Sequence, residues 1–460
     1  IRRPPRSTQG VSSAASDVYK RQVDRQESIM RDCSCQDKKL ESLSQTLNKG
    51  LLFLFVVLTN SCFGQSEVSD DWPQIHGPGR DGKYWGAPLN TNWPNTGPPV
   101  VWKRKIGEGF SGPIASQGRV ILFHRMENEE IIECLEAASG KTIWSYAYPT
   151  SYRDSFGFDN GPRATPVVQD GRVYCFGAEG NLHCRNFKTG KVIWTVSVHA
   201  QDVLRKGFFG ASCSPLVSGL QVIVNVGSRD NAGIVAFDKR DGKFLWKATD
   251  HEASYASPVE TRLSGQRHTF VFTRRGLVDL NPLTGQVRSE VRWRSRSSAS
   301  VNAATPLVVG NLVFLSASYR TGANLIRIQD GEWSSIWSSD EVLSNHYATS
   351  VHEKGYLYGF HGRQDVPPGP SLRCVELRSG KVQWSQDRFG AGTLLVAGRH
   401  LIIMNENGEL ILADLSHQAF RELQRFRVLS GVVRAYPALS KGRFFVRNEG
   451  ILACVDLRPE

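Results

Sequence analysis

The sequence lacks any apolar run long enough to cross a membrane as a helix. Its longest run, Leu51–Leu58, has 8 residues, whereas a spanning helix needs about 20 apolar residues. It also lacks a run of five or more basic residues, because its lysines and arginines are scattered along the chain. Scattered charges are typical of a solvated surface. We therefore expect no transmembrane segment in the mature chain and no nucleic-acid partner.

Short signatures of metal binding and catalysis are absent as well. No His-x-x-x-His or Cys-x-x-Cys spacing occurs, and no two cysteines are adjacent, so the sequence predicts no zinc site. The Gly-x-Ser-x-Gly motif of serine hydrolases is also missing. Calcium prefers clustered Asp, Asn and Glu oxygens. Glu252, Asn302 and an aspartate would form such a cluster only if folding brought them together.

The first 64 residues differ in character from the rest. Residues 1–29 are basic, rich in serine and unpatterned, and they precede Met30, so we interpret them as a non-native leader. Residues 30–64 contain lysines, then the apolar run, then the small residue Gly64, which predicts a signal peptide. Lipidation at Cys62 is the alternative. Both interpretations predict an exported protein, periplasmic or secreted.

Beyond residue 64 the chain repeats one unit. Residues 163–194 contain four short apolar runs separated by glycine-containing turns, which predicts a four-stranded antiparallel sheet. A closing tryptophan recurs every 44 to 52 residues, a spacing typical of propeller blades. The closing residues are Trp144, Trp194, Trp246, Trp293, Trp337 and Trp384. Because eight unit starts are present, we predict an all-β fold, an eight-bladed β-propeller of four-stranded antiparallel blades.

The eighth unit, residues 435–457, has only three predicted strands. The apolar segment Val100–Lys103, which includes Trp102, lies before the first unit. If this N-terminal strand completes the last blade, the ring closes and two exposed sheet edges disappear. We therefore expect residues 65–99 to be a lead-in and residues 100–460 to form a single propeller domain, as a monomer. Excluding residues 1–64 removes ten basic and six acidic residues, which lowers the net charge from +12 to +8.

The repeat resembles that of a known family. Thr189–Trp194 (Thr-Gly-Lys-Val-Ile-Trp) and its copies are similar to the motif A-x-D-x-x-T-G-K-x-x-W of the pyrroloquinoline quinone (PQQ) repeat, found in quinoprotein dehydrogenases and BamB-like proteins. The segments Trp72–Gln74 and Arg80–Gly82 also resemble the lead-in of secreted propellers of this kind. The resemblance implies that the tryptophan of each blade docks against the next blade. Residues with this structural role would be Trp102, Trp144, Trp194, Trp246 and Trp384.

Six cysteines lie beyond residue 64: Cys134, Cys175, Cys184, Cys213, Cys374 and Cys454. Four of them, Cys134, Cys184, Cys374 and Cys454, occupy the position where the family usually has a buried alanine, so we expect buried thiols. Cys175 and Cys184 flank a turn centred on Glu179 and Gly180. A two-residue turn would place them opposite each other and permit a disulfide, but a one-residue change of register would abolish it.

Candidate binding residues lie in the loops that lead into the inner strands, because those loops converge on the axis of a propeller. They are Asp154, Asp159, Arg163, His251, Glu252, Asn302, His346 and Arg434. Arg163 and Arg434 suit an anion, since a guanidinium presents paired donors to a carboxylate. The alternative is that these arginines form ion pairs with Asp154, Asp159 or Asp250 that tie blades together. No catalytic residue stands out.

Two functions remain open. The first is a binding or scaffold module in the cell envelope, similar to BamB of the outer-membrane assembly machinery, with a protein or carbohydrate partner and no cofactor. The second is a PQQ- and calcium-dependent alcohol or sugar dehydrogenase, for which the resemblance implies a quinone at the axis beside Ca²⁺. Such dehydrogenases are usually longer and carry an adjacent Cys-Cys pair, which this chain lacks. We favour the non-enzymatic binding function. A hydrolase or lyase is a weaker third interpretation, because no residue pair supports it.

Overall fold

The computed structural model describes residues 70–198, 210–227, 231–297 and 302–459. The predictions of a leader, a signal peptide and lipidation at Cys62 concern residues 1–64, which lie outside this part of the chain. None of the described elements is a helix long and apolar enough to cross a membrane.

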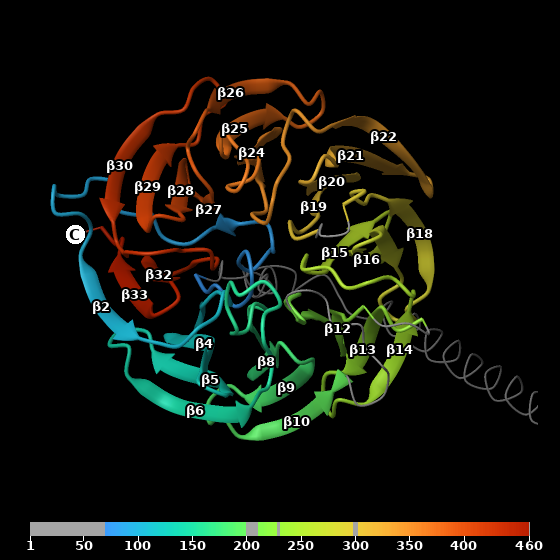
Figure 1. Cartoon of the computed structure of the whole chain (residues 1–460), viewed down its shortest axis with the longest axis horizontal. Helices are drawn as coiled ribbons and strands as arrows, with labels where there is room; N and C mark the ends of the chain where they lie inside the picture. Colours follow the sequence, from blue (N-terminus) through green and yellow to red (C-terminus); the bar gives the residue numbers. More distant parts are fainter. Residues whose placement is uncertain (1–69, 199–209, 228–230, 298–301, 460) are drawn as a thin grey trace, which may run out of the picture. The chain divides into compact units, whose positions relative to one another are not determined.

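Eight antiparallel sheets surround a common axis, so the predicted eight-bladed β-propeller is confirmed (Figure 1). Blades 1 to 7 each contain four strands that follow one another in sequence from the axis to the rim. The strands of blades 1 to 4 are β3 (Ile114–Ser116), β4 (Arg119–Met126), β5 (Glu129–Glu136) and β6 (Thr142–Pro149); β7 (Val167–Gln169), β8 (Arg172–Phe176), β9 (Asn181–Asn186) and β10 (Val192–Ser197); β11 (Leu216–Ser218), β12 (Gln221–Asn225), β13 (Ile234–Asp238) and β14 (Phe244–Ala248); and β15 (Val259–Leu263), β16 (Gln266–Phe272), β17 (Gly276–Leu280) and β18 (Val287–Arg292).

The strands of blades 5 to 7 are β19 (Leu307–Val309), β20 (Leu312–Ala317), β21 (Gly322–Gln329) and β22 (Glu332–Ser339); β23 (Val351–Glu353), β24 (Tyr356–His361), β25 (Ser371–Glu376) and β26 (Val382–Gln386); and β27 (Gly392–Ala397), β28 (His400–Asn405), β29 (Glu409–Asp414) and β30 (Glu422–Arg427). A short strand near the N-terminus, β1 (Lys83–Tyr84), pairs in parallel with β27 at the inner edge of blade 7.

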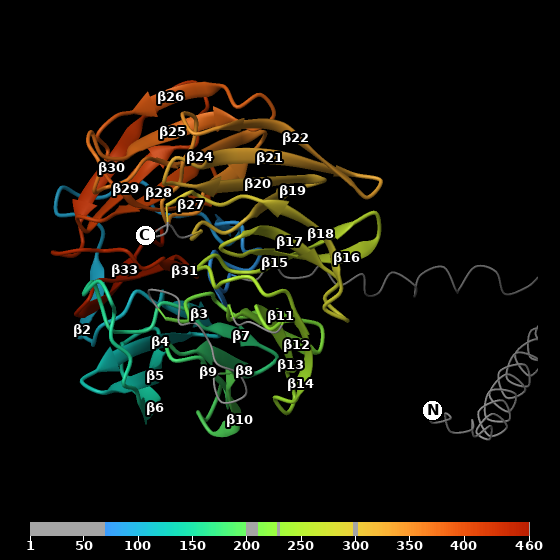
Figure 2. The same cartoon turned by 45° about the vertical axis from the view of Figure 1, so that its right-hand side comes forward.

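The ring is closed by a strand from each end of the chain. Blade 8 contains β31 (Ala438–Ser440), β32 (Arg443–Arg447) and β33 (Ile451–Asp456), and its outer strand is β2 (Val100–Lys105). β2 pairs with β33 in antiparallel orientation, with Trp102 opposite Cys454 (Figure 2). This pairing confirms the predicted closure.

The core lies between blades, because each sheet buries both faces against its neighbours. All five residues of β12 and of β13 are buried, as expected for strands covered on both sides. The outer strands behave differently. In β2 the exposed residues alternate with half-buried ones, because its neighbours cover only one side of this strand at the rim.

Six tryptophans at the same position of the repeat connect successive blades. The indole of Trp194 lies against Gly242 of the next blade, and its Nε1–H donates to the Lys239 carbonyl oxygen at 3.0 Å. Gly242 has a φ of +74°, and a Cβ there would lie 2.8 Å from the ring, so only glycine fits. The other indoles donate to the following blade in the same way, Trp102 to Ala137, Trp144 to Phe187, Trp246 to Pro282, Trp337 to Leu377 and Trp384 to Ser416.

Each of five docked tryptophans lies opposite a small buried residue on the adjacent strand. These residues are Cys134, Cys184, Ala236, Cys374 and Cys454. All five side chains are fully buried, which confirms the expectation of buried thiols. The sixth docked tryptophan, Trp337, lies opposite the larger buried Leu325.

One expectation about register is wrong, and one possibility that the sequence left open does not occur. In blade 4 the position of the docked tryptophan is held by Ser289, which pairs with Asp279, whereas Trp293 lies beyond the end of β18 and donates to the Gly322 carbonyl. In blade 2 the turn has three residues, because Gly177 N–H donates to the Asn181 carbonyl. Cys175 therefore lies opposite His183 and Cys184 opposite Tyr174. Both thiols are free, so the disulfide does not form.

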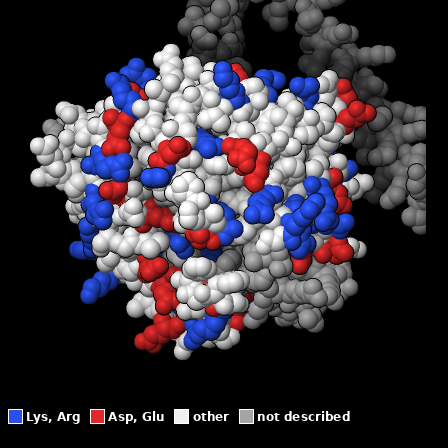
Figure 3. Space-filling model, turned by 45° about the horizontal axis from the view of Figure 1, so that its top comes forward, with Lys and Arg blue, Asp and Glu red and all other residues white. Residues whose placement is uncertain are grey.

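Basic and acidic side chains are mixed on the surface. The face shown in Figure 3 carries blue and red residues side by side. Some of these charges form pairs across blades, such as Lys239 with Asp170 at 2.8 Å. This distribution agrees with the solvated surface expected from the scattered lysines and arginines.

Replacing one docked tryptophan will measure the strength of the contact between blades. We expect Trp194→Ala to lower the free energy of unfolding by about 3–5 kcal/mol, the usual effect of removing a buried aromatic ring. Trp85, which is 58% exposed, supplies the matched control. Urea denaturation monitored by circular dichroism gives both values, and equal losses for Trp194→Ala and Trp85→Ala would contradict the docking role.

Candidate binding site at the propeller axis

The N-terminal segment, residues 70–84, crosses the axis and contacts most of the blades. Trp72 forms a backbone bridge to Ala115 of blade 1, and the Pro73 carbonyl accepts the Val168 N–H of blade 2. At the other side of the ring the Gly82 carbonyl accepts the Val396 N–H of blade 7. Figure 1 shows this blue segment at the centre of the ring. The segment therefore closes one end of the central channel.

Arg80 anchors this segment on the axis. Its buried guanidinium donates to the carbonyl oxygens of Pro215 in blade 3 and Pro258 in blade 4, and to Gln74 Oε1. Burial lowers the pKa of Arg80 to about 10, so the group remains charged at neutral pH. Its charge is balanced by carbonyl dipoles of two blades, which fixes the segment relative to both.

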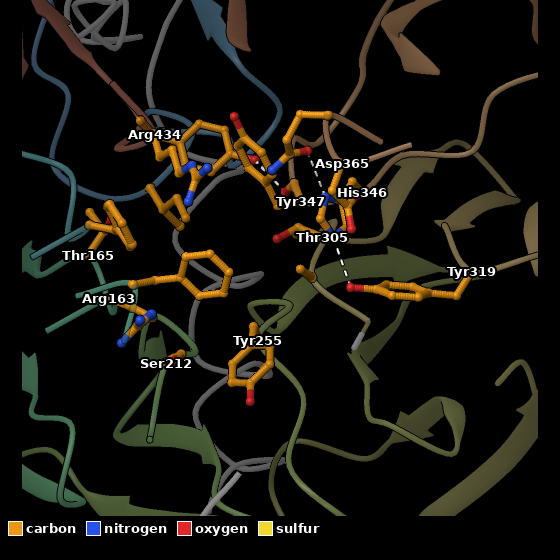
Figure 4. A pocket seen from close by; sticks show the side chains of 16 residues that line it. Arg163, Thr165, Ser212, Tyr255, Thr305, Tyr319, His346, Tyr347, Asp365 and Arg434 are labelled. Carbon is orange, nitrogen blue, oxygen red and sulfur yellow. Dashed lines mark hydrogen bonds between the residues drawn. The ribbon is translucent and has the colours of Figure 1, made fainter. Parts of the chain in front are cut away.

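A cavity of about 320 Å³ lies above the segment, and Ile75 forms part of its lining (Figure 4). Its other walls come from loops of seven blades. They are formed by Phe110, Phe158, Arg163, Thr165, Ser212, Tyr255, Ala303, Thr305, Tyr319, His346, Tyr347, Gln364, Asp365, Arg434 and Tyr436. Because the N-terminal segment closes the channel on one side, the cavity is blind.

One wall presents Arg434 between aromatic rings. Its guanidinium lies 5.7 Å from the centres of both the Phe110 and Phe158 rings, within the range of cation–π attraction. Its Nε donates to Glu406 Oε1 at 2.8 Å, and the Tyr347 hydroxyl donates to the same oxygen at 2.8 Å. The two terminal nitrogens of Arg434 make no hydrogen bond to the described residues. The bond to Glu406 therefore fixes this side chain, while the N–H groups of its two terminal nitrogens can donate to a ligand.

Arg163 lies on the same wall, and an aromatic ring and a buried carboxylate fix its position. Its guanidinium is 5.4 Å from the centre of the Phe110 ring, and Nη2 donates to Asp154 Oδ2 at 3.0 Å. The buried Asp154 carboxylate also accepts the backbone N–H groups of Phe156 and Phe158. Because one carboxylate binds both the loop and the arginine, it holds the Phe158 loop in place beside the cavity.

The opposite wall is polar and contains a neutral hydrogen-bonded group beside an ion pair. His346 Nδ1 lies 2.9 Å from Gln364 Oε1, and its Nε2 lies 2.9 Å from the Tyr319 hydroxyl (Figure 4). An amide oxygen can only accept, so Nδ1 carries the proton and Nε2 accepts the hydroxyl of Tyr319. Burial lowers the pKa of His346, which agrees with a neutral ring. Asp365, also on this side, is paired with Arg363.

The eight candidate residues separate into three groups. Arg163, His346 and Arg434 line the cavity. Asp154 and Asp159 support it, since Asp154 binds Arg163 and Asp159 accepts the N–H groups of Gly109 and Gly161. Burial raises the pKa of Asp159. Both carboxylates therefore stabilise the loop that carries Arg163.

The remaining three candidates lie away from the cavity. The buried His251 contacts Thr273 Oγ1 and Glu290, Glu252 pairs with Arg294 at 2.7 Å, and Asn302 donates to the carbonyls of Thr273 and Trp293. These contacts connect neighbouring loops, and they leave the carboxylate of Glu252 engaged.

Several lining residues were not among the predicted site residues. Phe110 precedes an inner strand, in the same position relative to its blade as Arg163, so the repeat offered a signal for it. Tyr319 and Gln364 lie in the turns that follow β20 and β24. Ile75 belongs to the N-terminal segment. Nothing in the local sequence of these three indicates that they reach the axis.

The described residues do not fit a calcium ion beside a quinone. Nowhere in the described ranges do three His, Cys, Asp or Glu side chains gather in a way that could hold a metal. Calcium takes six to eight oxygen ligands, whereas Asp365 is paired with Arg363, and Glu406 with Arg434 and Tyr347.

The fold defines a class: eight-bladed β-propellers built from PQQ-like repeats. The family model described as "Outer membrane protein assembly factor BamB" matches residues 127–366. The chain belongs to this family.

Individual relatives are distant. The chain is 22% identical over 286 residues to the outer membrane protein assembly factor BamB of Moranella endobia, covering 59% of this chain and 69% of that protein. It is 27% identical over 165 residues to the dehydrogenase subunit of a quinone-dependent alcohol dehydrogenase from Komagataeibacter europaeus, covering 32% of this chain but only 22% of that subunit. The match thus spans about a fifth of the dehydrogenase. The crystal structure of a quinohemoprotein alcohol dehydrogenase from Comamonas testosteroni superposes with a TM-score of 0.61 at 13% identity, over 85% of this chain and 82% of that one, which shows a shared fold.

Acid should loosen the N-terminal segment through His76. This ring is buried against Tyr436, and its Nε2 has no hydrogen-bond partner among the described residues. Burial lowers the pKa of His76 from 6.5 to about 3. Between these values the unfolded chain binds a proton that the folded protein does not, so the free energy of unfolding should fall by about 1.4 kcal/mol per pH unit for this residue as pH decreases.

His76→Phe should remove that contribution. Urea denaturation at several pH values between 6.5 and 4 gives the slope for each protein, and exposed His417→Phe is the matched control. An unchanged slope in His76→Phe would show that this histidine is not held neutral by burial.

Proposed function

We propose that this protein is a non-enzymatic binding module of the cell envelope that takes an acidic carbohydrate into its axial cavity. The observation that carries the proposal is Arg434, whose two terminal nitrogens make no hydrogen bond to the described residues and which lines an aromatic cavity of about 320 Å³. That volume lies within the usual range of small-molecule sites, about 300–1,000 Å³.

The two walls of the cavity suit two parts of such a ligand. Arg434 presents parallel N–H donors to a carboxylate, and Phe110 and Phe158 flank this position with apolar faces. Across the cavity, Tyr319, His346 and Gln364 supply neutral hydrogen-bonding groups, which suit hydroxyl groups. A uronic acid combines a carboxylate, hydroxyls and an apolar ring face in one residue.

The envelope location is part of the same proposal. It is supported by the family, whose name refers to outer-membrane assembly, and by the signal peptide predicted over residues 30–64. An envelope protein that contacts the loops around the cavity is the second partner that this location makes available.

Binding of uronic acids should depend on Arg434. We expect an oligogalacturonide to bind by isothermal titration calorimetry, and Arg434→Gln to weaken the affinity about tenfold or more, because a charge-assisted hydrogen bond contributes about 1.5–3 kcal/mol. The matched control is Arg427→Gln, at a residue whose side chain is 61% exposed at the rim. Equal affinity for the neutral galactose oligomer, or no effect of Arg434→Gln, would contradict the proposal.

The dehydrogenase alternative has its own test. Since the described carboxylates near the cavity are all engaged, we expect no alcohol-dependent dye reduction after incubation with PQQ and Ca²⁺. Absorption spectroscopy of the dialysed protein measures quinone retention separately from turnover. Retained quinone together with dye reduction would establish the dehydrogenase and overturn the binding function.

A further inference from the structure

Two of the eight contacts between blades lack the docked tryptophan. In blade 4 its position is taken by Ser289, opposite Asp279, and in blade 7 by Gln424, opposite Leu412. In both cases the large ring that elsewhere fills the space between blades is replaced by a smaller side chain. The two gaps differ in which other segments of the chain pack into them.

The gap between blades 7 and 8 is filled by the N-terminal lead-in. Leu89 and buried Trp93 pack into the same hydrophobic cluster as Leu423 and Phe426 of blade 7. The Asn90 N–H donates to the Leu457 carbonyl at 2.7 Å. Leu457 occupies the position in blade 8 that Ala137 occupies in blade 1, where the carbonyl accepts the Trp102 indole. A segment from elsewhere thus replaces both the bulk and the N–H donor of the missing tryptophan.

The gap between blades 4 and 5 is filled only in part, by Trp333 of blade 5 against Phe270 of blade 4. A cavity of about 580 Å³ lies there, and we call it the blade 4/5 slot; it is lined by Leu263, His268, Asp279, Ser289, Gly331 and Trp333, among others. A Cβ on Gly331 would meet no described atom within 4 Å, whereas a Cβ on Gly242 would lie 2.8 Å from its tryptophan. No described segment of the chain fills the slot as Leu89 and Trp93 fill the other gap.

The slot contains a buried acceptor that lacks a donor. Asp279 takes the position that alanine or cysteine holds in other blades, and it is 1% exposed. Its Oδ2 lies 2.8 Å from His268 Nδ1, but its Oδ1 has no hydrogen-bond partner among the described residues. Burial raises the pKa of Asp279. A buried oxygen without a donor is costly, so a ligand that brings an N–H group would be stabilised here.

The remaining walls favour a flat aromatic group and disfavour a cation. The Trp333 ring packs edge-on against Phe270, 5.9 Å between centres, and offers an aromatic surface to the slot. Arg262 and Arg288 also line the slot. Two guanidinium groups repel a cationic ligand but attract an aromatic ring.

We propose that the blade 4/5 slot binds an indole, the side chain of a tryptophan supplied by a partner polypeptide. An indole is the group that six equivalent positions of this chain hold, it is flat and uncharged, and its N–H can donate to Asp279. The slot lies between the outer parts of two blades, apart from the axial cavity, so the inference does not rest on the proposed carbohydrate function.

The probe is N-acetyl-tryptophanamide, with N-acetyl-phenylalaninamide as the analogue that lacks the indole N–H. We expect calorimetry to detect weak, millimolar binding of the tryptophan compound and affinity about tenfold lower for the phenylalanine compound, the loss of one hydrogen bond to a buried carboxylate. Arg434→Gln should leave both values unchanged, which separates this slot from the axial cavity.

Two variants test whether the tryptophan compound binds in the blade 4/5 slot. Asp279→Ala/Ser289→Trp rebuilds the Ala236–Trp246 arrangement and should abolish binding while raising or preserving the melting temperature. Asp279→Ala alone retains the space but removes the acceptor, and should weaken binding of the tryptophan compound to the level of the phenylalanine compound. If the double variant has a much lower melting temperature than the wild type, the test rests on Asp279→Ala alone. The proposal is overturned if the wild type does not bind the tryptophan compound, if Asp279→Ala binds it as tightly as the wild type, or if binding persists in a folded double variant.

Discussion

The docking of a tryptophan on the turn of the next blade is the contact on which the structure depends. A single four-stranded sheet cannot bury both of its faces, and each blade is stable only between two others. The indole contributes bulk to that interface and, through its Nε1–H, a fixed hydrogen bond to a carbonyl. Since the same contact recurs around the ring and includes Trp102 on β2, it also joins the N-terminal strand to blade 1. Closure of the ring and packing of its blades thus depend on one repeated interaction.

The central channel poses a second physical problem, because eight inner strands leave space at the axis. In this protein the N-terminal segment occupies that space from one side, and Arg80 binds carbonyl groups of two blades at once. The result is a floor for the axial cavity. The loops on the other side then supply its walls, and Asp154 and Glu406 fix the two arginines that face into it. The position of the cavity follows from the closed ring, while its chemistry follows from the loops.

The two blades without a docked tryptophan show how the repeat can be modified. At blade 7 the lead-in replaces the missing ring, so the interface remains filled. At blade 4 the small-residue position has become Asp279 and the tryptophan position Ser289, and a polar slot results. Seven filled interfaces stabilise the ring, which allows the eighth to keep a cavity. The two blades that depart from the repeat therefore say more about this particular protein than the six that follow it.

The sequence alone determined the number of blades, the closing strand, five of the six tryptophans that dock and the burial of the four repeated cysteines, because a periodic pattern reports contacts that recur at fixed spacing. It also indicated Arg163, His346 and Arg434, since each precedes an inner strand. Only the tertiary structure decided that His251, Glu252 and Asn302 lie away from the cavity and that Tyr319, Gln364 and Ile75 contribute to it. The tertiary structure likewise decided the register that separates Cys175 from Cys184 and places Ser289 where spacing had suggested Trp293. A turn that is one residue longer, or a loop that bends toward or away from the axis, changes every such contact. These choices depend on packing between segments far apart in the chain, which no local pattern records.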